Sequence, residues 1–211
     1  MIILSGGIKG GAGKSTIATN LTIMRSLAGR DVLLIDADTQ ESSTNFTKLR
    51  HQNLGDAGYT CTKLNGRAVL TDGKRLAEKY DDLIIDAGGR DTTSQRAALI
   101  LADVVVIPFV PRSFDVWTLK EVAEMIEEAR VMNPRLVAYS FINKADSVGS
   151  ENSEAAEYIQ ETEAIKFIDS PLGYRKVFGK AVAQGLAVVE YIPKDDKAIS
   201  EFKTFFNVVF S

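Results

Sequence analysis

The stretch that decides the fold runs from Ser5 to Thr16 and reads SGGIKGGAGKST. It follows a short apolar run at residues 2–4 and precedes a helical pattern that ends at Gly29. Glycines let the backbone turn its N–H groups inward around a phosphate, and the helix adds its positive dipole end. A Gly-Lys-Ser sequence here brings an ammonium to the β- and γ-phosphates and a hydroxyl to Mg²⁺. The stretch predicts a phosphate-binding loop made of Gly10, Gly11, Ala12, Gly13, Lys14, Ser15 and Thr16.

Short apolar runs alternate with helical patterns along the whole chain. The runs cover residues 2–4, 32–35, 83–85, 104–107 and 136–142. The helical patterns cover residues 15–28, 92–101, 115–132, 151–161, 172–184 and 195–209. The runs do not alternate with polar residues, which indicates strands buried on both faces. We therefore predict an α/β fold, a doubly wound and mainly parallel sheet flanked by helices, in one domain over residues 1–211.

Carboxylates follow two of the predicted strands. Asp36 and Asp38 follow the second run, and Asp86 follows the third run as in a Walker B segment. Ligands of open parallel sheets lie beyond the carboxyl ends of the strands, so we expect these groups beside the phosphate loop. Asp86 is expected to accept a hydrogen bond from a magnesium-bound water or from Ser15, in the second shell of the metal. An acidic or glycine-rich turn that only connects two elements is the alternative for each motif.

Two glycines and an arginine follow the Walker B aspartate. Gly88 and Gly89 allow the backbone to approach a γ-phosphate closely and to move when that phosphate leaves. Arg90 is either a cation for the transition state or a surface arginine paired with Asp91.

Composition narrows the classes of function. The chain has one cysteine, Cys61, and one histidine, His51, which excludes an internal disulfide and a metal centre built from these residue types. The net charge is −3, from 25 basic and 28 acidic residues, so contact with nucleic acid needs a local basic patch. No apolar run approaches the roughly 20 residues of a membrane-spanning helix, and no secretory leader opens the chain. We expect a cytoplasmic protein.

Residues 9–15, KGGAGKS, resemble the deviant Walker A loop of the ParA/MinD family of ATPases. Ile8 stands where the general phosphate-loop pattern has glycine. The resemblance implies that Lys9 crosses a dimer interface and binds the phosphates of the nucleotide held by the partner subunit. There it would be a cation placed where charge builds up on the transferring phosphoryl group. A solvated loop lysine is the alternative.

The resemblance extends to the loop at residues 36–40, DADTQ, which is similar to the DxDPQ segment of that family with Thr39 in place of proline. It implies that Asp36 joins Ser15 in holding Mg²⁺, and that Asp38 orients or deprotonates the attacking water. Lys9, Lys14 and Asp38 are then the expected catalytic residues, with ATP and Mg²⁺ as the ligands.

Residues 143–146, NKAD, match the base-reading motif of GTPases. Relatives of ParA commonly use this asparagine on adenine, so the resemblance implies a contact between Asn143 and the base of ATP. Specificity for guanine, or an aspartate that only caps the next segment, is the alternative. Pro171, in the segment 169–172, is expected in the other wall of the base pocket.

The resemblance covers residues 1 to about 205. Residues 112–115 look like the P-x-x-x-D loop of ParA proteins, and residues 175–190 look like their C-terminal R-x-x-F and G-x-x-V-x-E stretch. Because the sequence opens directly on the phosphate loop, we expect a protein of the short ParA type, without an N-terminal helix-turn-helix domain. The resemblance implies an ATP-dependent sandwich homodimer that binds DNA non-specifically. It would be nucleoid-associated and drive plasmid or chromosome partition, or position another cargo, through a centromere-binding adaptor like ParB.

The C-terminal third carries the candidate DNA patch, because residues 175–180 contain no carboxylate. Its members are Arg175, Lys176, Lys180, Lys194, Lys197 and Lys203, and a solvated helix face is the alternative. A MinD-like membrane-cycling regulator is the main rival function, but the tail at residues 198–210 has Lys203 as its only cation, so we expect it to pack on the sheet. A metabolic ligase or kinase would not need Lys9, and a non-hydrolysing scaffold would not need Asp38.

Overall fold

The computed structural model describes residues 1–89, 92–111 and 116–211. In this part of the chain, eight strands form one sheet in the order β3-β2-β4-β1-β5-β6-β7, with β8 paired to β6. The strands are β1 (Ile2–Ser5), β2 (Val32–Ala37), β3 (Thr60–Lys63), β4 (Asp82–Ala87), β5 (Val104–Phe109), β6 (Val137–Ala145), β7 (Lys166–Phe167) and β8 (Leu172–Gly173). The helices are α1 (Lys14–Leu27), α2 (Ser42–Leu54), α3 (Ala68–Leu76), α4 (Thr93–Leu101), α5 (Val116–Met132), α6 (Glu151–Gln160), α7 (Lys176–Val182) and α8 (Asp196–Val209). Every strand pair is parallel.

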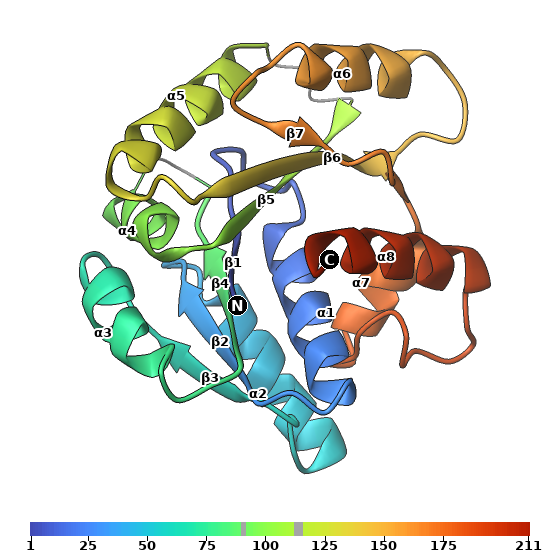
Figure 1. Cartoon of the computed structure of the whole chain (residues 1–211). Coiled ribbons are helices and arrows are strands. Elements are labelled where there is room, and N and C mark those ends of the chain that lie inside the picture. The colour runs from blue at the N-terminus through green and yellow to red at the C-terminus, as the bar shows by residue number, and fades with distance from the viewer. Residues whose placement is uncertain (90–91, 112–115) are drawn as a thin grey trace.

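The sheet is buried on both faces, as the continuous apolar runs predict. Successive residues of one strand enter opposite cores: Leu33 and Ile35 face the core under α3, α4, α5 and α6, while Leu34 faces the core under α1, α7 and α8. Figure 1 shows these two helix layers on either side of the sheet. The prediction of a doubly wound parallel α/β sheet is confirmed.

The C-terminal helix α8 packs on the sheet, as expected. Phe202 and Phe205 are fully buried, and the ring of Phe205 lies 4.3 Å from that of Phe141 on β6. The apolar residues of the tail therefore complete the core.

Three elements between β2 and β4 have no counterpart in the sequence prediction: α2, β3 and α3. Helix α2 escapes detection because its buried positions are mostly polar, namely Ser43, Thr47 and Arg50 beside Phe46. Strand β3 is a short, partly exposed edge strand, and α3 contains Gly73. Neither α2 nor β3 has the apolar pattern that marks the other elements, whereas α3 is amphipathic but only nine residues long and interrupted by a glycine.

Two predicted boundaries are wrong. Strand β6 continues through Asn143 to Ala145, so the NKAD segment begins inside the strand. The predicted helix at residues 172–184 is split, because Leu172–Gly173 pair with β6 as β8 before α7 begins at Lys176. Arg90, Asp91 and the loop at residues 112–115 lie outside the described residues.

Candidate nucleotide-binding site

Three neighbouring strands bring polar side chains into one row where they end. Asp36 on β2 lies opposite Asp86 on β4, which lies opposite Ser5 on β1. The phosphate loop follows directly, and the Ser5 hydroxyl donates a hydrogen bond of 2.9 Å to the Lys14 carbonyl at the start of α1. The register thus places both predicted acidic loops beside the phosphate loop.

A cleft of about 1170 Å³ opens at this edge of the sheet. Pockets that bind small molecules are typically about 300–1,000 Å³, so the cleft has room for a nucleotide. It brings together most predicted phosphate and catalytic residues, with further positions that the sequence did not indicate. The lining includes Lys9, Gly10, Gly11, Gly13, Lys14, Ser15, Thr16, Asp38, Thr39, Gln40, Ser42, Gly88, Gly89, Thr92, Thr118, Glu121 and Lys144.

The phosphate loop needs glycine for two reasons. Gly11 and Gly13 have φ angles of 74° and 98°, in the left-handed region that favours glycine. A Cβ at Gly13 would also lie 2.5 Å from Nδ2 of Asn143. Gly13 is the N-cap residue of α1, so its conformation sets how the helix N-terminus faces the cleft.

Lys14 lies at the floor of the cleft, with a side chain that is largely buried. Its Nζ donates a hydrogen bond of 2.8 Å to the Lys9 carbonyl. Burial lowers the pKa of Lys14, and the carboxylates of Asp86 and Asp38 oppose the shift. A Cβ on Gly89 would lie 2.9 Å from this ammonium, so only glycine lets the loop after β4 come this close.

Asp36 and Asp86 both accept hydrogen bonds from the first turn of α2. Asp36 accepts backbone N–H bonds from Thr44 (2.7 Å) and Asp38 (3.2 Å). The Ser43 hydroxyl donates a bond of 2.7 Å to Oδ2 of Asp86. Ser43 belongs to none of the sequence motifs. Its contact with Asp86 could not be predicted, because α2 and β4 come together only in the folded protein.

The acidic groups fit a hydrated Mg²⁺ ion. Among the described residues, Oδ1 of the buried Asp86 has no hydrogen-bond partner. Burial raises the pKa of Asp86 to about 6, although the Ser43 and Ser15 hydroxyls act against the shift. Mg²⁺ in nucleotide sites keeps several waters and takes one or two protein oxygens besides the phosphates. An uncompensated carboxylate oxygen next to Ser15 suits such an ion.

Of the three predicted aspartates, Asp38 is the one that lines the cleft. Its Oδ1 accepts a bond of 3.0 Å from the Gln40 N–H, and a Cβ on Gly88 would lie 3.1 Å from the same oxygen. The carboxylate therefore stands across from the glycine loop that approaches Lys14.

The end of β6 holds the phosphate loop from the other side. Nδ2 of Asn143 donates a 2.7 Å bond to the Ala12 carbonyl, and Nζ of Lys144 donates a 2.7 Å bond to the Gly11 carbonyl. Asn143 is buried behind the loop and does not line the cleft, whereas Lys144 does. Sequence reasoning missed this role of Lys144. Pro171 is exposed in the segment before β8 and does not line the cleft either.

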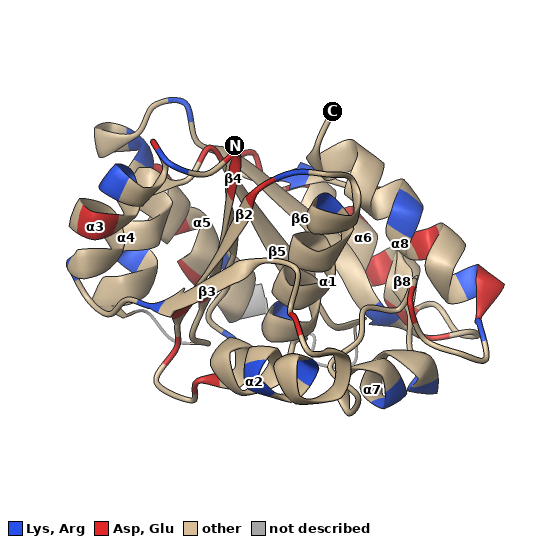
Figure 2. Cartoon of the chain, turned by 90° about the horizontal axis from the view of Figure 1, so that it is seen from below, with Lys and Arg blue, Asp and Glu red and all other residues tan. Residues whose placement is uncertain are grey.

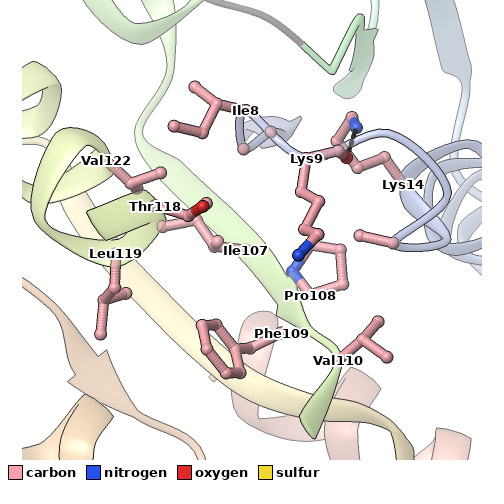
Figure 3. Close-up of a pocket in the computed structure, with 13 residues that line it drawn as sticks. Ile8, Lys9, Lys14, Ile107, Pro108, Phe109, Val110, Thr118, Leu119 and Val122 are labelled. Carbon is pink, nitrogen blue, oxygen red and sulfur yellow. Dashed lines mark hydrogen bonds between the residues drawn. The ribbon is translucent and has the colours of Figure 1, made fainter. Parts of the chain in front are cut away.

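A second, apolar cavity of about 30 Å³ lies between the phosphate loop and α5. Figure 3 shows the Lys9 side chain at its edge, extended beside Pro108 at the end of β5. The cavity is too small for a nucleotide, so the larger cleft is the candidate site.

The predicted basic patch divides into two kinds of residue. Arg175 forms a two-pronged ion pair with Glu201 on α8, with hydrogen bonds of 3.0 and 2.6 Å. The guanidinium of Arg175 therefore binds α8 through Glu201. The five lysines of the predicted patch are exposed: Lys176, Lys180, Lys194, Lys197 and Lys203.

A family model described as the CobQ/CobB/MinD/ParA nucleotide binding domain matches residues 3–189. The chain belongs to this family. The resemblance to ParA and MinD seen in the phosphate loop is therefore confirmed. The chain is 27% identical over 203 residues to the maintenance of carboxysome distribution protein A of Halothiobacillus neapolitanus, covering 96% of this chain and 93% of that protein.

Solved structures of the family share the fold. The ATP complex of an McdA variant from Cyanothece has a TM-score of 0.79 at 18% identity, covering 99% of this chain and 95% of that one. Cobyrinic acid a,c-diamide synthase from Mycobacterium smegmatis, bound to an ATP analogue and magnesium, also has a TM-score of 0.79, at 19% identity with 99% and 93% coverage. Within residues 1–89, 92–111 and 116–211, no helix has the length and apolar character to cross a membrane.

Proposed function

We propose that this protein is a Mg²⁺-dependent ATPase of the ParA type, built as one domain over residues 1–211. ATP would join two copies into a sandwich dimer that binds DNA without sequence preference and positions a cargo. The observation that carries the proposal is that one cleft is lined by Lys14, by Asp38 and by Lys9 of the phosphate loop. The family match and the ATP-bound McdA structure support the same ligand.

Binding of the phosphates falls to the loop and Lys14. The N–H groups at the start of α1 surround the phosphates, and the Lys14 ammonium exchanges the Lys9 carbonyl for a phosphate oxygen. Because Gly89 lies against this ammonium, its loop moves aside as the γ-phosphate enters. Ser15 and Asp36 would hold Mg²⁺, with Asp86 in its second shell, and the ion would supply positive charge beside the phosphates.

Hydrolysis falls to Asp38 and Lys9. Asp38 faces the cleft and takes the proton of the attacking water, or orients that water. Lys9 reaches the phosphates held by the partner copy and stabilises charge on the transferring group. Asn143 and Pro171 remain the proposed contacts of the adenine, although in this conformation Asn143 holds Ala12.

The cargo is proposed from the relatives. One is named for carboxysome distribution, and another is the protein ParA of Rhizobium radiobacter, 26% identical over 144 residues. A DNA-bound dimer on the nucleoid, driven by a ParB-like adaptor, suits plasmid or chromosome partition as well as positioning of a cellular body. Packing of α8 into the core argues against a membrane-cycling role for the tail.

Gel filtration with a non-hydrolysable ATP analogue tests the dimer. The wild type is expected to elute as a dimer with the analogue, and Lys9→Ala as a monomer that still binds nucleotide. Lys14→Ala is the matched control on the same loop, and it should lose nucleotide binding altogether. A Lys9→Ala protein that still dimerises would overturn the cross-subunit role.

A further inference from the structure

Helices α2 and α7 form a surface without carboxylates. Residues 42–55 and 175–189 contain no Asp or Glu, although the chain has 28 of them among 211 residues. Figure 2 shows the two helices side by side along one edge of the molecule, with blue basic positions on both. In a chain of net charge −3, two such segments brought together give a local positive surface.

The two helices are joined by direct contacts. Nδ2 of Asn53 on α2 donates a 3.0 Å bond to the Gln184 carbonyl, just after α7. Arg50 donates to the Gly185 carbonyl (2.9 Å) and pairs with Glu190 at 2.7 Å. This arginine and its partner neutralise each other beneath the surface, so the pair fixes the geometry without adding exposed charge.

The exposed cations of the surface are Lys48 on α2 and Lys176 and Lys180 on α7. Among the described residues, none of the three forms an ion pair. Glu41, immediately before α2, pairs with Lys63 at 2.9 Å, and this pair together with the more distant charge of Lys48 lowers the pKa of Glu41. We call these three lysines, with the exposed polar side chains His51, Gln52, Asn53 and Gln184, the α2–α7 face.

The other predicted DNA-binding lysines have acidic neighbours. Lys194 and Lys197 flank Asp195 and Asp196, and Lys203 lies on α8 two residues after Glu201. Figure 2 shows blue and red positions interleaved along α8. Repulsion between carboxylates and phosphates makes that region a poorer polyanion surface than the α2–α7 face.

We propose that the α2–α7 face binds the phosphate backbone of DNA, and that Lys48, far from the C-terminal third in sequence, is one of its contacts. This inference rests on the DNA binding proposed above. Lysine ammonium groups meet phosphates as point charges, while amide and imidazole side chains donate hydrogen bonds to phosphate oxygens. Phosphate contacts carry no sequence information, which agrees with non-specific binding. Pairing two copies doubles the number of lysines.

Lys48→Gln tests the face, with binding to a random-sequence DNA duplex measured over a range of salt in the presence of the ATP analogue. Loss of one phosphate contact should weaken binding several-fold and reduce the salt slope by about one. Lys48→Arg should restore both. The matched control is Lys74→Gln on α3, which removes the same charge from the opposite helix layer and should bind as the wild type. Gel filtration confirms that each variant still dimerises.

The outcomes separate the two proposals. If the wild type binds no DNA in any nucleotide state, the proposed DNA-binding function is wrong. If the wild type binds DNA and Lys48→Gln binds as tightly as Lys74→Gln, the α2–α7 face is wrong while DNA binding stands. Polyglutamate and unlabelled DNA of equal charge are compared as competitors. If polyglutamate displaces the bound DNA as effectively as the unlabelled DNA does, the face recognises acidic protein, and the phosphate assignment is overturned.

Discussion

At the scale of single residues, the three acidic groups beside the phosphate loop differ in what they can do. Asp36 accepts two backbone N–H bonds, and Asp86 is fully buried and bonded to Ser43. Asp38 alone among them lines the cleft. We therefore propose that chemistry on a water molecule belongs to Asp38, while Asp36 and Asp86 hold the first turn of α2 and would serve the metal.

Replacing Asp38 with alanine should slow ATP turnover while nucleotide binding and dimerisation persist. The lost group acts on water and not on the phosphates, and a general base contributes about 10²–10⁴-fold in rate. Steady-state phosphate release by the variant, with nucleotide affinity measured in parallel, checks this. Asp38→Asn, which keeps the size of the side chain, should be equally slow. Turnover at the wild-type rate would move the role to Asp36.

At the scale of elements, α2 links the nucleotide site to the C-terminal region. Its first turn is held by Asp36 and Asp86, and its last turns are held by Arg50, whose guanidinium also donates to the Ala57 carbonyl. Polar contacts thus replace the apolar stripe that usually docks a helix. The helix depends on partners in three other segments.

Arg50→Met should destabilise the protein strongly. It takes the cation from the partly buried Glu190 carboxylate, which among the described residues keeps only the Ala187 N–H as a donor, and it removes the side-chain donor of two carbonyls. Breaking a buried ion pair from one side costs about 3–5 kcal/mol. Denaturant unfolding of the nucleotide-free protein measures the loss. Lys63→Met is the control, because its pair with Glu41 is exposed and such pairs contribute about 0–1 kcal/mol. Equal losses in the two variants would contradict the structural role of Arg50.

At the scale of the whole molecule, the protein carries a net charge of −3 and a segregated basic surface. A monomer presents few unpaired cations to a polyanion, and the acidic residues on the rest of its surface repel the polyanion. In the proposed ATP-bound dimer the basic surface would be doubled, so we expect the nucleotide state to set the affinity for DNA.

Binding to DNA should therefore require ATP and fall steeply with salt. Counterion release gives a slope of about −0.9 per phosphate contact in a plot of log affinity against log salt. Mobility-shift titrations with ATP, with ADP and without nucleotide check the dependence, and duplexes of unrelated sequence should bind alike. Tight binding without nucleotide, or binding insensitive to salt, would count against the dimer switch.

The amino-acid sequence determined the elements whose signal is local. The buried strands, the phosphate loop and the carboxylates at strand ends were predictable, because an apolar run or a glycine-rich turn depends on near neighbours in the chain.

The tertiary structure decided everything that depends on distant partners. Helix α2 is capped by Asp36 of β2 and docked by Arg50 on Glu190, neither of which leaves a periodic apolar pattern. Arg175 is a further example. The sequence suggested it as a DNA contact, and in the structure it forms an ion pair with Glu201. These roles escaped the sequence because a polar contact between segments far apart in the chain exists only once the sheet has brought them together.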